Sequence, residues 1–210
     1  MTRAVWILSL CVLVLAPWAL AQDEPAATDA RREEILRTFK RGPLNAPPED
    51  AMLLRMLIQV GALKNGVEVG TANGYSAVHM GIAFERTGGK LTTIEIDPKV
   101  AAEARDNLAR AGLAKTVSVV EGDALKVLPK LEGEYDFVFI DAVKRDTLKY
   151  FEAIRPRLAP RAVVVVHNAV TYASAMQDYL DMIQASKDYE TVIVRTAGNR
   201  DGMSVAYRKR

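Results

Sequence analysis

The stretch that decides the fold reads Val67-Glu68-Val69-Gly70-Thr71-Ala72-Asn73-Gly74-Tyr75-Ser76. Its apolar start is typical of a strand, and the two glycines then form a turn that opens a helix. Glycines in such a turn let the backbone approach a ligand, and the first amides of the helix point toward it. The dinucleotide pattern G-x-G-x-x-G is not met, because Ala72 follows Gly70 by two, so a single carboxylate is a better ligand than a pyrophosphate. Taken alone, the turn could equally be structural.

Outward from this turn, short apolar strands alternate with helices. Strands are expected near 66–70, 90–96, 116–121, 135–141 and 161–167, and helices near 74–86, 98–111, 123–130 and 144–158. This order is typical of an α/β fold with a parallel sheet and helices on both faces. A helix near 172–186 then precedes two strands, near 189–196 and 202–208, whose short link predicts a terminal antiparallel pair.

Composition narrows the classes of function. Half of the 210 residues are apolar, which is enough for a packed core. Lys and Arg number 28 against 26 Asp and Glu, so the charge gives no reason to expect nucleic acid as a partner. The one cysteine, Cys11, lies in the N-terminal apolar segment, which excludes an internal disulfide and a thiolate metal cluster from the rest of the chain.

The first 21 residues have the organisation of an export signal. Arg3 precedes an apolar run over 4–16, and Ala19-Leu20-Ala21 fits a cleavage site. Residues 4–21 are also barely long enough for an uncleaved membrane anchor. Both interpretations predict an exported protein, either periplasmic or extracellular.

The rest of the chain is expected to form one domain. The small, polar segment 22–30 has the composition of a linker, and the domain follows over 31–210. It begins with a helix over 30–41, a loop over 44–50 and a second helix that ends near Leu63.

Polar residues follow the strands at the edge where open parallel sheets bind ligands. Glu95 ends the second strand, where a carboxylate can accept both hydroxyls of a ribose, or it is a solvated strand-end acid. Asp123 and Ala124 follow the third strand and could read the edge of an adenine, although Asp123 is an equally good helix cap. Together with the glycine turn, these positions favour a nucleoside that carries an amino-acid tail.

Four motifs in this order resemble the cation-dependent O-methyltransferases, the family of catechol and caffeoyl-CoA O-methyltransferases, over roughly residues 31–208. The motifs are Val67 to Ser76, Ile94-Glu95-Ile96-Asp97, Glu121-Gly122-Asp123-Ala124 and Phe139-Ile140-Asp141-Ala142-x-Lys144. The resemblance implies a Rossmann-like methyltransferase fold with a seven-stranded, mostly parallel sheet. It also implies S-adenosylmethionine as the cofactor, with these residues around it: Glu68, Gly70, Tyr75 and Ser76 at the methionine part, Glu95 at the ribose, Asp123 and Ala124 at the adenine, and Asp141 beside them.

The resemblance places a divalent cation on an Asp that ends the fourth strand and an Asp-Asn pair that ends the fifth. Here those positions are Asp141 and the pair His167-Asn168. The imidazole removes one negative charge and adds a nitrogen ligand, which weakens the case for Mg²⁺ and improves it for Zn²⁺, Mn²⁺ or Fe²⁺. We expect a cation on these three residues. The alternative is that His167 is a hydrogen-bonded strand-end histidine in a methyltransferase that has lost its ion.

The resemblance assigns Lys144 as the base that removes the proton from the substrate hydroxyl. A free lysine amine, with a pKa of about 10.4, is a poor base at neutral pH, so a nearby cation would be needed. A solvated surface lysine is the alternative. The resemblance also places the loop Leu44-Asn45-Ala46 over cofactor and substrate, and Asn168 beside the acceptor.

These interpretations predict methyl transfer to a phenolic small molecule, such as a catechol, with Lys144 and Asp141 as catalytic residues. One alternative is a metal-free methyltransferase with His167 as the base. Another is a non-catalytic ligand-binding protein, because the supply of S-adenosylmethionine outside the cytoplasm is doubtful. A nicotinamide-dependent dehydrogenase is less consistent with the glycine spacing. The helical segment 31–63 could cover its own site or pack against a second copy in a homodimer.

Overall fold

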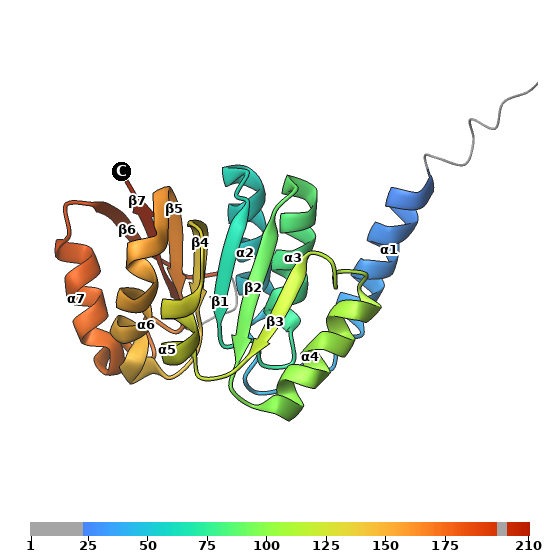
Figure 1. Ribbon diagram of the computed structural model, residues 1–210, viewed down its shortest axis with the longest axis horizontal. Coiled ribbons are helices and arrows are strands. Elements are labelled where there is room, and N and C mark those ends of the chain that lie inside the picture. The colour runs from blue at the N-terminus through green and yellow to red at the C-terminus, as the bar shows by residue number, and fades with distance from the viewer. Residues whose placement is uncertain (1–22, 197–200) are drawn as a thin grey trace, which may run out of the picture.

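The strands of the chain form one sheet whose order reverses beside the glycine turn. The computed structural model describes residues 23–196 and 201–210 (Figure 1). In these residues a seven-stranded sheet has the order β3-β2-β1-β4-β5-β7-β6. Its strands are β1 (Asn65–Val69), β2 (Lys90–Glu95), β3 (Val117–Glu121), β4 (Tyr135–Ile140), β5 (Leu158–Val166), β6 (Tyr189–Val194) and β7 (Met203–Arg208).

The first five strands pair in parallel, as the alternation of strands and helices predicts. β1 lies between β2 and β4, β3 extends the sheet beyond β2, and β5 extends it beyond β4. β7 is antiparallel to both β5 and β6, so the last two strands form the expected antiparallel pair, with β7 inserted next to β5. The predicted α/β fold with a mostly parallel sheet is therefore confirmed.

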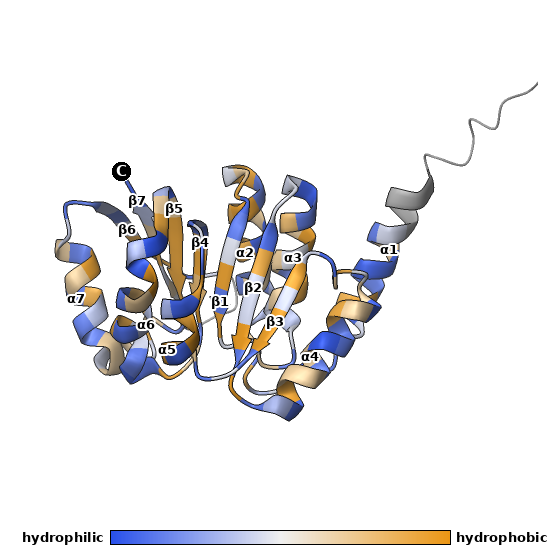
Figure 2. Cartoon of the chain, viewed as in Figure 1, coloured by the Kyte–Doolittle hydropathy of each residue, from blue (hydrophilic) through white to orange (hydrophobic). Residues whose placement is uncertain are grey.

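Helices cover both faces of the sheet and bury two apolar cores. One core joins the sheet to α2, α3 and α4 and contains Leu54, Phe84 and Leu108. The other joins it to α6 and α7 and contains Phe151 and Tyr179. In Figure 2 the strand β5 is largely orange, as expected for a strand with helices on both faces. The helices are α1 (Asp23–Arg37), α2 (Pro48–Gly61), α3 (Tyr75–Thr87), α4 (Pro98–Arg110), α5 (Ala124–Val127), α6 (Thr147–Ile154) and α7 (Gln177–Ala185).

Local signals set the start of α4, which follows the strand end that carries Glu95. The Asp97 carboxylate accepts hydrogen bonds from the backbone N–H of Lys99 at 2.8 Å and of Val100 at 3.2 Å. Pro98 occupies the first turn, where its missing N–H costs nothing. β2 therefore passes directly into α4, and the strand-end carboxylate stays at the edge of the sheet.

The N-terminal helix differs from its prediction. α1 begins at Asp23 and ends at Arg37, so most of the segment 22–30 is helical where composition predicts a linker. Tertiary contacts hold the end of this segment and the turn after it: Asp29 pairs with Arg86 at 2.9 Å, and the buried guanidinium of Arg32 pairs with Glu85 at 2.5 Å and donates to the carbonyl of Ala111 at 3.0 Å. These contacts fix the helix on the domain, which composition alone does not reveal.

Two later helices are shorter than expected. The segment 144–158 divides into a 3₁₀ turn, α6 and a second 3₁₀ turn at Arg155–Arg157, where Pro156 cannot continue a helix. The segment 172–186 likewise begins with a 3₁₀ turn at Ala173–Met176 before α7. Neither change moves the strand ends that carry the candidate site.

The predicted export signal, residues 1–21, lies outside the described residues, so its cleavage and the membrane-anchor alternative stay predictions. In the part of the chain that the structure describes, no helix combines the length and the apolar character needed to cross a membrane. The domain expected over 31–210 is described except for residues 197–200.

Candidate active site

The glycine turn meets the end of β4 at the point where the strand order reverses. Asp141 donates its backbone N–H to the carbonyl of Val69 at 2.9 Å. Gly70 has a φ of +95°, and a Cβ on it would lie 2.2 Å from the carbonyl oxygen of Asp141. Only glycine permits this approach. The two predicted site residues Gly70 and Asp141 therefore come together at the switch point, where doubly wound sheets bind their ligands.

Gly70→Ala is expected to destabilise the fold by more than about 3 kcal/mol, because backbone strain adds to a clash with the backbone of Asp141. Gly133→Ala is the matched control, since Gly133 has a φ of +81° with nothing within 4 Å of the added Cβ. The control should cost only about 1 kcal/mol from the positive φ. Urea unfolding of both variants measures the difference, and equal losses would show that the contact with Asp141 is unimportant.

Behind the turn lies a buried carboxyl group. Glu68 is fully buried, and its oxygens accept hydrogen bonds from the hydroxyls of Ser76 at 2.5 Å and Thr93 at 2.6 Å. Thr71 lies 2.5 Å from the same Thr93 hydroxyl. Burial raises the pKa of Glu68 to about 8 despite these two hydrogen bonds. A neutral carboxyl group and Ser76 thus support the turn from behind it.

The buried Glu68 predicts a loss of stability at alkaline pH. The unfolded chain releases this proton near pH 4.5, whereas the folded chain keeps it until about pH 8. Because the folded state binds more protons between these values, the free energy of unfolding falls as the pH rises, by a few kcal/mol in total. Glu68→Gln should flatten this dependence in urea unfolding across the interval, whereas Glu121→Gln at an exposed strand end should not. Parallel curves for the wild type and Glu68→Gln would contradict the assignment.

Glu95 joins the second strand end to the same turn. Its Oε2 accepts the backbone N–H of Ala72 at 2.9 Å, and its Oε1 accepts that of Asp97 at 3.0 Å. Each carboxylate oxygen offers about two acceptor positions, so one on each remains for a further hydrogen-bond donor. The side chain is partly exposed. This carboxylate can hold the turn and still accept a pair of ligand hydroxyls.

Asp123 and Ala124 lie at the third strand end, at the start of α5. The Asp123 carboxylate accepts the backbone N–H of Leu125 at 3.0 Å and so caps the short helix. Both residues are partly exposed. The cap predicted for Asp123 is present, and its second oxygen lies 3.7 Å from the Nζ of Lys126. An adenine contact at this position stays a prediction.

The loop before α2 is tied to the glycine turn. The side chain of Asn45 donates to that of Asn73 at 2.8 Å, which places the loop beside the turn, while Leu44 is 78% exposed.

Tyr75 is buried instead of facing a ligand. It is 3% exposed, its ring packs edge-on against Phe39 at 5.1 Å, and it lines a hollow of about 530 Å³ beside α1.

The fourth and fifth strand ends form a cluster of charged side chains. The Lys144 ammonium donates to Asp141 Oδ1 at 2.6 Å. His167 lies between two carboxylates, with Nε2 at 2.9 Å from Asp50 Oδ2 and Nδ1 at 3.1 Å from Asp141 Oδ2, the latter at ion-pair distance without hydrogen-bond geometry. The hydroxyl of Thr196 donates to the other oxygen of Asp50 at 2.5 Å. We call Asp50, His167, Asp141 and Lys144 the bridge cluster.

The electrostatics of the bridge cluster keep it charged. Burial opposes a positive charge on His167, but Asp141 and Asp50 raise its pKa to about 9. Burial likewise opposes ionisation of Asp141, but His167 and Lys144 lower the pKa of that carboxyl below its ordinary value. Nε2 of His167 is hydrogen-bonded to Asp50 and Nδ1 faces Asp141, so neither ring nitrogen is turned away from a carboxylate.

The three predicted metal ligands are not arranged as a cation site. His167 faces carboxylates on both sides, and the side chain of Asn168 donates to Asp201 at 2.8 Å instead of pointing toward Asp141. Asn168 has a φ of 60°, and Asp201 also accepts the backbone N–H of Thr171 at 2.9 Å. Among the described residues, no group of three or more His, Cys, Asp or Glu side chains could hold a metal ion. The donor set as it stands does not fit a divalent cation.

The sequence patterns did not indicate three residues that contact the predicted site residues: Asp50, Thr93 and Asp201. Asp50 is 117 residues from His167, and the local pattern gives it an ordinary place in the first turn of a helix. Thr93 faces Glu68 across paired strands, and only the register shows this. Asp201 could have been suspected from its place beside Gly202, in the link before a strand.

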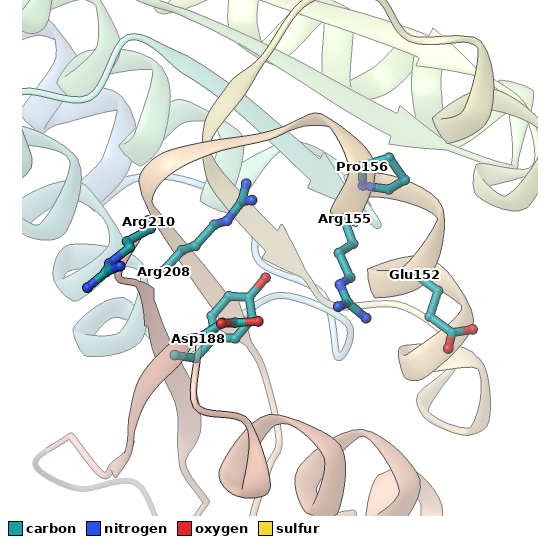
Figure 3. A pocket seen from close by; sticks show the side chains of 7 residues that line it. Glu152, Arg155, Pro156, Asp188, Arg208 and Arg210 are labelled. Carbon is teal, nitrogen blue, oxygen red and sulfur yellow. The ribbon is translucent and has the colours of Figure 1, made fainter.

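A separate hollow of about 610 Å³ lies at the other end of the sheet (Figure 3). Its lining residues surround the start of β5 and of β6, whereas the candidate site follows the strand ends. Three arginines and two acids share it, so its charge is mixed. The lining residues are Glu152, Arg155, Pro156, Asp188, Tyr189, Arg208 and Arg210.

A mostly parallel sheet with a glycine turn and strand-end carboxylates at its switch point is typical of nucleotide-binding α/β proteins. The chain belongs to the O-methyltransferase family, whose model matches residues 20–194. It is 30% identical over 184 residues to a catechol O-methyltransferase of Niastella koreensis, with 79% of this chain and 83% of the relative covered. It is 32% identical over 203 residues to a catechol O-methyltransferase of Mycobacterium tuberculosis, with 89% and 90% covered.

Solved structures agree with the family. An O-methyltransferase of Bacillus cereus in complex with SAH has a TM-score of 0.76 at 26% identity, and the match covers 87% of this chain and 91% of that one. The chain is therefore an S-adenosylmethionine-dependent O-methyltransferase with a Rossmann-like fold, which confirms the resemblance drawn from its four motifs.

Proposed function

We propose that the chain methylates a hydroxyl of a phenolic small molecule, such as a catechol. The observation that carries this proposal is the meeting of Gly70 with Asp141 at the switch point, with Glu95 bonded to the same turn and Lys144 bonded to Asp141. The names of the two catechol O-methyltransferase relatives support the acceptor class. We assign the cofactor to the strand ends of β1, β2 and β3 and the acceptor to the edge beside Lys144.

In this proposal the glycine turn and Ser76 lie at the methionine part of the cofactor, Glu95 accepts the ribose hydroxyls, and Asp123 with Ala124 borders the adenine. The loop with Leu44 and Asn45 covers the site, because Asn45 is tied to the turn at Asn73. Glu68 and Tyr75 act from behind as supports, since both side chains are buried.

The chemistry is an in-line displacement. The ammonium of Lys144 first releases one proton to solvent, and the neutral amine then takes the proton of the acceptor hydroxyl on Nζ. The resulting phenolate oxygen attacks the methyl carbon of the sulfonium. The carbon–sulfur bond breaks, its electron pair stays on sulfur, and the products are the methyl ether and S-adenosylhomocysteine. In water a phenol and an alkylammonium have similar pKa values, about 10 and 10.4, so proton transfer from a phenol to an amine is nearly isoenergetic there. Orientation by the fold supplies the rest of the acceleration.

The divalent cation implied by the family is not part of this proposal. Asp141, His167 and Asn168 would be its ligands, but their side chains are engaged with Lys144, Asp50 and Asp201. The alternative with His167 as the base is also left out, because both of its nitrogens face carboxylates.

The test is an acceptor panel with the full chain and labelled S-adenosylmethionine. We expect label transfer to catechol and to related phenols, and no transfer to aliphatic alcohols, whose hydroxyls are far less acidic. Cofactor binding without transfer to any phenol would overturn the proposal in favour of the ligand-binding alternative.

We also propose that the domain acts outside the cytoplasm, as residues 1–21 suggest. This proposal requires a supply of S-adenosylmethionine outside the cytoplasm.

A further inference from the structure

Three elements distant in sequence meet at the bridge cluster. Asp50 lies in the first turn of α2, His167 follows β5, and Asp141 follows β4. Asp50 is 1% exposed and His167 is 4% exposed, so neither side chain is a surface group. The imidazole is buried between two carboxylates, and the hydroxyl of Thr196 donates to one of them, Asp50. The end of a strand does not by itself require such an arrangement.

The distances show that the imidazole fills the space between the two carboxylates. Nε2 of His167 lies 2.9 Å from Asp50, and its Nδ1 lies 3.1 Å from Asp141. The ammonium of Lys144 lies 2.6 Å from the other oxygen of Asp141, so both oxygens of this carboxylate already face a nitrogen. A divalent cation on Asp141 would have to displace both of these partners.

We infer that His167, held between Asp50 and Asp141, takes the place of a bound cation at the acceptor edge, with Asp50 as its positioning residue. This inference rests on the proposed function. The chain then transfers methyl groups without a metal. It also follows that the acceptor needs one acidic hydroxyl rather than a vicinal pair, because there is no ion for two oxygens to chelate.

Metal binding tests the inference without any turnover. The metal-stripped full chain is titrated with Mn²⁺ by calorimetry, and we expect no stoichiometric site. His167→Asp should create one, because it replaces the internal cation by a third carboxylate beside Asp50 and Asp141, and we expect at least about tenfold tighter binding. His167→Asn, of similar size and without charge, is the control and should gain no site. A stoichiometric Mn²⁺ site in the wild type that Asp141→Asn abolishes would overturn the inference.

Turnover gives the second measurement. Chelator, or Mg²⁺ and Mn²⁺ added singly, should change the wild-type rate by less than about twofold, whereas His167→Asp should depend on added Mn²⁺ by about tenfold or more. A wild-type rate that chelator abolishes and Mg²⁺ restores would overturn the inference. A preference for catechol over phenol that disappears when the metal is chelated would also overturn the inference. If no acceptor is methylated at all, the proposed function fails while the Mn²⁺ titrations still decide this inference.

The role of Asp50 as a positioning residue can be tested separately, by its effects on kcat and on cofactor affinity. Asp50→Asn should lower kcat by about tenfold while the Kd for S-adenosylmethionine stays within about twofold, because Asp50 acts on the acceptor edge through His167. A change in melting temperature alone, with kcat unaltered, would show a purely structural role and remove Asp50 from the inference.

Discussion

Lys144→Ala is expected to lower kcat by about 10² to 10⁴, the range usual for the loss of a general base, with little change in cofactor affinity. Its Nζ lies 2.6 Å from Asp141, which fixes the amine at the end of β4, and its side chain is only 17% exposed. The variant loses the proton acceptor without touching the strand ends assigned to the cofactor. Initial rates with catechol and calorimetric titration with S-adenosylmethionine measure the two quantities separately.

The chain offers a matched control for this variant. Lys149 also pairs with an acid three residues before it, Asp146 at 2.7 Å, but its side chain is 64% exposed. Lys149→Ala should leave kcat unchanged, because an exposed pair of this kind has a small effect. Equal kcat values for the wild type and Lys144→Ala would refute the assignment of the base.

Glu95→Ala is expected to raise the Kd for S-adenosylmethionine by about 10- to 100-fold, because hydrogen bonds to a charged acceptor contribute about 1.5 to 3 kcal/mol. The carboxylate holds the backbone N–H of Ala72 and of Asp97, so it also fixes the turn against which the cofactor lies. At saturating cofactor the turnover rate of Glu95→Ala should return to most of the wild-type rate, since Glu95 is not assigned a contact with the acceptor.

Glu121→Ala is the control for Glu95, because Glu121 pairs with Glu95 in register on the neighbouring strand and is exposed. It should leave the Kd within about twofold, as expected for a solvated surface acid. An unaltered Kd in Glu95→Ala, with a melting temperature equal to that of the wild type, would refute the ribose assignment.

The sequence predicts the succession of strands and helices and their parallel pairing well, because short apolar runs alternate with helical segments along the chain. The glycine turn, Glu95 and Asp141 could be placed at one edge because the carboxyl ends of parallel strands share that edge. The link between Asp141 and Lys144 was also readable, since they are three residues apart.

The parts that could not be predicted depend on contacts between distant segments. The pairing of Asp50 with His167 joins the start of α2 to the end of β5, and no local pattern records it. The orientation of Asn168 toward Asp201 depends on a left-handed backbone conformation and on a second loop. For this reason the metal ligands named from the resemblance are present in the chain while their side chains are turned to other partners.

Product analysis decides whether the chain methylates a phenol with Lys144 as the base. The full-length wild type and Lys144→Ala are incubated with catechol and S-adenosylmethionine, and the products are identified by mass spectrometry. We expect a catechol monomethyl ether and S-adenosylhomocysteine in equal amounts from the wild type, with at least about 100-fold less of both from Lys144→Ala. Bound cofactor with no methylated phenol from the wild type, or equal product from the two chains, would contradict it.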